Sequence, residues 1–108
     1  MKREIFIKTS FAALHNWPAC PFEEVRYLRR LHRHIFHVQA WFPVHHNNRD
    51  LEFIKVKQDI NLWIRNKWED QELIGISCEM MAEALMNNFG CSKVTVSEDN
   101  ENGATIEK

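Results

Sequence analysis

The chain has 108 residues, of which 44% are hydrophobic, and this suits one compact domain over residues 1–108. Its 14 basic and 15 acidic residues give a formal net charge of -1, which argues against a general binder of nucleic acids or anionic membranes. Three cysteines without a Cys-x-x-Cys pair favour a reducing compartment, and no signal peptide or stretch of spanning length is found, so we expect a soluble cytoplasmic protein.

The first half of the chain predicts two strands separated by a loop. "REIFIKTSF" is rich in β-branched and aromatic residues and predicts a strand, and the two prolines of "NWPACPFEE" then indicate a loop. From His32 to Phe42 the residues alternate. One face of this second strand carries His32, His34, Phe36, Val38, Ala40 and Phe42. The segment "VHHNNRD" predicts a turn after it.

The second half predicts two helices and a hairpin. Apolar residues recur at helical spacing near residues 53–68 and again from Cys78 to Phe89. Glu52 is expected to cap the first helix, Ser77 to cap the second, and Gly90 to end it. "KVTVSE" predicts a strand, and the Asn-Gly turn in "DNENG" would let "ATIE" pair back. We therefore expect an α+β fold, a four-stranded antiparallel sheet with two helices on one face in the order ββααββ.

The histidine pair of the second strand needs partners. His32 and His34 lie on one face, at the head of an apolar stripe, and burying imidazoles there without partners is costly. Zinc is one such partner, and a catalytic zinc takes three protein ligands and an open position. His15, just past the first strand, is the candidate third ligand. Two other interpretations stay open: strand histidines with other partners, and a basic nucleic-acid patch at "RRLHRH".

Five short motifs occur in a characteristic order: "FAALHNW", "LHRH", "EF", "SCE" and "VTVSE". Together they resemble the 6-pyruvoyltetrahydropterin synthase / 6-carboxytetrahydropterin synthase family over essentially the whole chain, and the element order resembles its tunnelling fold. The resemblance implies a lyase acting on 7,8-dihydroneopterin triphosphate or a related pterin. It also implies Zn²⁺ bound by His15, His32 and His34, with Arg33 replacing the family glycine, and a homo-oligomer, a trimer or hexamer with active sites between subunits.

The resemblance also implies two substrate contacts. Glu98 stands where the family has a glutamate that holds the pterin, and a carboxylate can accept two parallel N–H bonds from the pterin edge. Its alternative role is a solvated acid beside a hairpin turn. Ser77 matches a family threonine that lines the pterin pocket, and its alternative role is a simple helix N-cap.

The chain departs from the family at the catalytic centre. Leu28 stands where the family has its catalytic cysteine, and leucine cannot abstract a proton. The connector "EDQELIGI" lacks the family's Asp-His pair. Cys20, near Glu23 and Glu24, is the candidate for a relocated catalytic residue, although a loop cysteine can also have no such role. Two hypotheses follow: a zinc-dependent pterin lyase, or a non-catalytic protein that binds zinc and a pterin or purine-like ligand.

Overall fold

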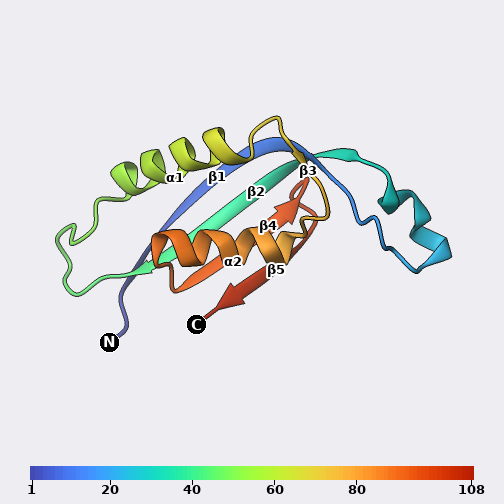
Figure 1. Ribbon diagram of the computed structural model, residues 1–108. Coiled ribbons are helices and arrows are strands. Elements are labelled where there is room, and N and C mark those ends of the chain that lie inside the picture. The colour runs from blue at the N-terminus through green and yellow to red at the C-terminus, as the bar shows by residue number, and fades with distance from the viewer.

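Two long antiparallel strands, β1 (Glu4–His15) and β2 (His32–Pro43), form the centre of the sheet in the computed structural model, which describes residues 1–108 (Figure 1). β4 (Lys93–Glu98) pairs with the other side of β2, and β5 (Asn102–Glu107) completes that edge as an antiparallel hairpin. A two-residue strand, β3 (Glu72–Leu73), runs parallel to the end of β1. The sheet order is therefore β3-β1-β2-β4-β5.

The expected four-stranded antiparallel sheet in the order ββααββ was wrong. The sheet has five strands and is mixed, because β3 joins β1 in parallel. The connection from β1 to β2 also holds a 3₁₀ helix, η1 (Glu23–Arg29). A strand of two residues has no alternation that a sequence could display, since the period-2 signal needs at least four residues. β3 is identified only through its pairing with Leu14 and His15.

Two α-helices, α1 (Phe53–Lys67) and α2 (Cys78–Phe89), lie against one face of the sheet (Figure 1). α1 packs over β1, whereas α2 packs over β4 and β5. The predicted caps are confirmed in both helices. The side chain of Glu52 accepts a hydrogen bond from the backbone N–H of Lys55 at 2.9 Å, and Ser77 Oγ accepts one from Met80 N–H at 3.1 Å. Gly90 then ends α2 in the left-handed conformation, with φ 69°.

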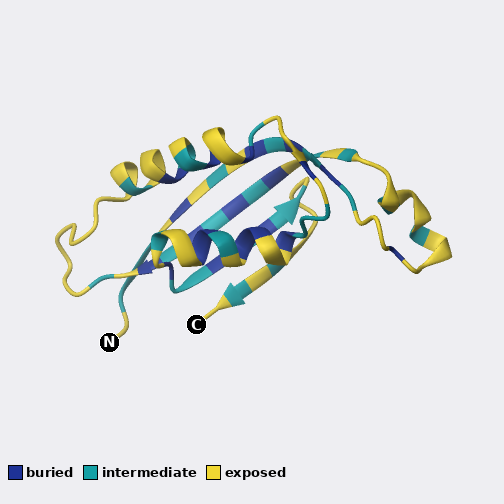
Figure 2. Ribbon diagram, viewed as in Figure 1, coloured by how far each residue is buried: buried dark blue, intermediate teal, exposed yellow.

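The core lies between the helices and the inward face of the sheet (Figure 2). Every second residue of β1 and β2 points inward, as the alternation predicts. Phe11 of β1 stacks on Phe36 of β2 with ring centroids 5.3 Å apart, and Trp68 packs on Phe11 at 5.5 Å. Ile60 of α1 and Met81 of α2 are fully buried against this layer. The inward-facing residues of β2 from Phe36 to Phe42 therefore belong to the core. His32 and His34 continue the same face at the start of the strand.

The hairpin between β4 and β5 forms, but its turn is not at the predicted Asn-Gly pair. Asp99 and Asn100 make the turn with φ of 53° and 58°, while Asn102 and Gly103 already belong to β5. A Cβ atom at position 103 would collide with the Val96 carbonyl oxygen, so glycine is needed there for close strand approach. This register places Asp99 at the end of the sheet that carries the histidines.

The segment between β1 and β2, residues 16–31, projects from the body of the protein (Figures 1 and 2). Several of its large side chains are exposed, including those of Trp17, Phe22 and Tyr27. Its base is fixed by Asn16, whose side-chain oxygen accepts a hydrogen bond from Gly75 N–H at 2.9 Å. Neither this segment nor any other part of the chain contains a helix long and apolar enough to cross a membrane.

Candidate metal centre

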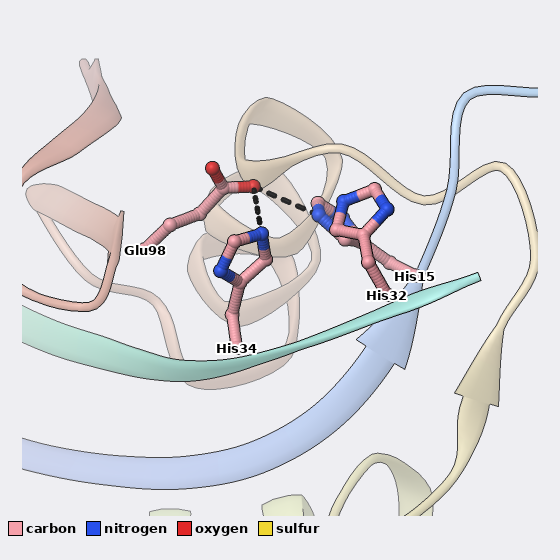
Figure 3. A group of neighbouring side chains, drawn as sticks. All are labelled: His15, His32, His34 and Glu98. Atoms are coloured by element: carbon pink, nitrogen blue, oxygen red, sulfur yellow. Dashed lines mark ion pairs between the residues drawn. The ribbon is translucent and has the colours of Figure 1, made fainter. Parts of the chain in front are cut away.

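Sheet pairing brings the three predicted ligands to one end of the inward face. His15, the last residue of β1, lies directly opposite His32, the first residue of β2, and His34 follows on the same face. Glu98 ends β4, and its partner on β2 is Phe36, the next inward-facing residue after His34. The four side chains converge, with one possible ligand atom from each lying within 4.8 Å of the others (Figure 3).

Each imidazole is oriented by an oxygen bonded to its Nδ1 atom. These pairs are His15 with Ile76 O at 2.9 Å, His32 with Arg30 O at 2.8 Å, and His34 with Asp99 Oδ2 at 2.6 Å. A carbonyl or an ionised carboxylate can only accept, so each Nδ1 carries the hydrogen. In the neutral rings the Nε2 lone pairs therefore remain free, which is the usual arrangement of metal-binding histidines.

Two of the three Nε2 atoms are withdrawn from water without hydrogen-bond partners. His15 Nε2 and His32 Nε2 are both buried and make no hydrogen bond. Burial lowers the pKa of His15, and the contacts with Ile76 and Glu98 only partly oppose this effect. Unpaired buried acceptors are costly in a folded protein, and three imidazoles beside a carboxylate are a donor set that zinc accepts. The group could therefore hold a metal ion.

A cavity of about 420 Å³ opens beside this cluster. Its 14 lining residues include His15, His32, Glu98, Ser77 and Leu28. This volume is within the range of small-molecule sites, roughly 300–1,000 Å³. The structure thus brings two of the three predicted ligands and both predicted substrate contacts to one cavity, and it places Leu28 in the same wall.

Cys20, the candidate for a relocated catalytic residue, is not brought to this cavity. It is fully buried in the projecting segment, where its Sγ lies 3.7 Å from the Val25 carbonyl oxygen. Cys78, the first residue of α2, does line the cavity. Burial, with additional contributions from Glu98 and Glu79, raises the pKa of the Cys78 thiol to about 12. In the metal-free protein Cys78 is therefore not a thiolate near neutral pH.

Asp99 is the site residue that the sequence analysis missed. Its Oδ1 accepts the backbone N–H of Ile35 at 3.0 Å, while its Oδ2 accepts from His34. The hydrogen bond from the Ile35 N–H is the main cause that lowers the pKa of the Asp99 carboxyl, and the hydrogen bond from His34 is the second. An aspartate directly after a strand end is a turn signal, but its contact with His34 depends on a register that the sequence does not display. The remaining histidines, His37, His45 and His46, lie outside the cluster.

No family model and no curated protein matches the chain. Among solved structures, the fold is similar to that of the uncharacterized protein WS1659 from Wolinella succinogenes, with a TM-score of 0.75. The match covers 100% of this chain and 99% of that chain, at 12% sequence identity. At this identity the likeness concerns the fold alone.

Proposed function

We propose that the protein is a zinc-dependent, pterin-binding lyase resembling the 6-pyruvoyltetrahydropterin synthase / 6-carboxytetrahydropterin synthase family. The observation that carries this proposal is the convergence of three free Nε2 atoms, from His15, His32 and His34, beside the cavity that Glu98 and Ser77 line. Zinc is the metal that best matches three imidazoles.

The residues around the cavity have separate roles in this proposal. The Glu98 carboxylate accepts N–H bonds from the amino-pyrimidinone edge of the pterin and so orients the ring. Ser77, at the start of α2, lies in the wall beside it. Bound zinc would supply Lewis-acid polarisation of the oxygens on the substrate side chain. The substrate is 7,8-dihydroneopterin triphosphate or a related pterin, by the family resemblance.

A second candidate function is a non-catalytic protein that binds zinc and a pterin or purine-like ligand. Three observations favour it. Leu28 lines the cavity where the family has a cysteine, and in the metal-free protein burial holds the pKa of the Cys78 thiol at about 12, well above that of a thiol poised to act as a base. Cys20 is buried away from the cavity. The residues expected to bind zinc and a pterin are therefore more completely present at the cavity than the residues expected to transfer a proton.

One experiment tests both candidates. Zinc-loaded protein is incubated with 7,8-dihydroneopterin triphosphate, and pterin binding is measured together with the release of triphosphate and acetaldehyde. We expect binding with very slow turnover, because a positioned general base contributes roughly 100- to 10,000-fold to a rate. Leu28→Cys should raise turnover, since a thiol beside bound zinc is expected to ionise more readily.

Cys20→Ser is the matched control for the thiol substitution. It should leave turnover unchanged, because Cys20 does not line the cavity. Robust wild-type turnover that Cys20→Ser abolishes would contradict this assignment of the site. Binding without any turnover, even in Leu28→Cys, would favour the non-catalytic candidate. Absence of pterin binding would exclude both candidates as stated.

A further inference from the structure

While the imidazoles are neutral, the position of Glu98 in the cluster is not explained by hydrogen bonding. Its Oε2 atom lies 2.8 Å from His15 Nε2 and 3.7 Å from His34 Nε2 (Figure 3). Both Nε2 atoms carry lone pairs, since the hydrogen of each ring is on Nδ1, and a carboxylate oxygen is also an acceptor. Acceptors brought this close in a partly buried site repel one another unless a proton or a metal cation lies between them.

We propose that Glu98 is the fourth ligand of the metal ion, through Oε2. When no pterin is bound, the metal centre is then a closed site of three histidines and one carboxylate, without an open coordination position. This inference rests on the metal centre of the proposed function, and it changes the resting role of Glu98 from a free pterin anchor to a metal ligand.

The distances from Glu98 to His15 and His34 agree with this coordination. Zinc bonds to nitrogen and oxygen of about 2.0–2.1 Å place neighbouring ligand atoms of a tetrahedron roughly 3.3 Å apart. The separations of 2.8 Å and 3.7 Å from Oε2 to the two Nε2 atoms lie on either side of that value. The carboxylate also supplies a negative charge, which three neutral imidazoles lack.

A shared carboxylate couples the metal to the ligand in the cavity. A pterin whose edge donates hydrogen bonds to both carboxylate oxygens of Glu98 would compete with the metal for the lone pairs of Oε2. Binding of the pterin would then open a coordination position at the metal. By linkage, a metal that holds Glu98 weakens pterin binding by the same factor as the pterin weakens metal binding.

The test compares Glu98→Gln with Glu79→Gln. Both glutamates line the cavity, but only Glu98 belongs to the cluster. Each protein is titrated with Zn²⁺ alone and with Co²⁺ alone, and thermal unfolding is followed with and without metal. In Glu98→Gln the Kd for metal should rise about 10-fold or more, since even outer partners of metal ligands are worth roughly 10–100-fold. In Glu79→Gln it should not change.

Two further readouts separate a metal ligand from a structural residue. Without metal, Glu98→Gln should be at least as stable as the wild type, because an amide N–H can donate to His15 Nε2 where the carboxylate cannot. With metal, the same variant should gain less stability than the wild type does. Azide should leave the visible spectrum of the Co²⁺-loaded wild type unchanged and should alter that of Glu98→Gln, in which a position is open.

The outcomes distinguish failure of this inference from failure of the proposed function. Wild-type metal affinity in Glu98→Gln, or equal destabilisation of that variant with and without metal, would overturn the role of Glu98 alone. A wild type that binds neither Zn²⁺ nor Co²⁺ would overturn the proposed function and this inference together.

Discussion

The three imidazoles of the cluster differ in their outer partners but share one orientation. Two Nδ1 atoms donate to backbone carbonyls, of Ile76 and Arg30, and the third donates to the carboxylate of Asp99. Backbone partners cannot be removed by a side-chain substitution. Of the three hydrogen bonds, only the one to Asp99 can therefore be removed by substituting the residue that accepts it.

Metal content should follow the face of β2 on which a histidine lies. His32→Ala removes one of three imidazole ligands and should lose stoichiometric zinc, whereas His37→Ala, which lies opposite Ser10 and Ser97 on the other face, should retain it. Binding should weaken below about pH 6, because protonated imidazole cannot bind a metal. Metal analysis after gel filtration measures this, and equal loss from both variants would contradict the site.

A second residue-scale prediction concerns Glu4 at the start of β1. Ser92 Oγ donates a hydrogen bond to Glu4 Oε2 at 2.5 Å, and this bond is the main cause that lowers the pKa of Glu4 below 4.5. The unfolded chain therefore binds this proton more readily than the folded one. The resulting stability is present above about pH 4.5 and is lost as the pH falls through the lowered pKa.

Ser92→Ala should consequently destabilise the protein less at acidic pH than at neutral pH. Denaturant unfolding of wild type and variant from about pH 7 to about pH 3 measures the difference in unfolding free energy. Glu4→Gln is the matched control, because it removes the titrating group and should abolish the pH dependence of that difference. A difference that stays constant across this range would contradict a role for Glu4 ionisation.

At the scale of elements, the start of α2 serves both the fold and the cavity. Ser77 caps the helix through Met80 N–H and also lines the cavity. Ser77→Ala should lower the unfolding free energy by about 1 kcal/mol, and Ser77→Asp, which keeps a capping oxygen, should restore it. Chemical denaturation measures both. If Ser77→Asp is stable but binds the pterin poorly, Ser77 contributes to ligand binding in addition to capping the helix. If Ser77→Ala is as stable as the wild type, the capping role is contradicted.

At the scale of the whole molecule, one face of the sheet is left uncovered by the chain. The helices lie on the opposite face, and the open face carries Phe6 and Ile35, which are 52% and 41% exposed. β3 pairs with β1 only at Leu14 and His15, so most of the outer edge of β1 lacks a partner strand. Exposed edges and apolar side chains of this kind are commonly covered by association.

We therefore expect a homo-oligomer, and the family resemblance implies a trimer or hexamer. Sedimentation velocity at micromolar concentration should detect it. Ile35→Glu should shift the distribution toward smaller species, because it places a charge on the open face, whereas Glu101→Gln in the β4–β5 turn should leave it unchanged. A wild-type monomer would contradict this expectation and would weaken the proposed function, since family active sites lie between subunits.

The sequence by itself determined the features that depend on neighbouring residues. Alternation predicted β2 and the shared face of His32 and His34, and helical spacing predicted α1 and α2. Ser77 and Gly90 marked the ends of α2 because capping depends on residues within one turn. The candidate ligand His15 came from the family resemblance and from its place just past the predicted first strand, which in the structure extends to His15 itself.

Only the tertiary structure decided which of these residues meet. The pairing of β1 with β2 sets His15 opposite His32, the pairing of β2 with β4 brings Glu98 to the same end, and the turn after β4 carries Asp99 to His34. β3 is defined by its pairing with the edge of β1. Cys20 does not reach the cavity because its side chain is buried within the projecting segment, although Leu28 of the same segment lines the cavity. Such contacts join residues many positions apart, and their register follows from the burial of whole strand faces, which no short window of sequence contains.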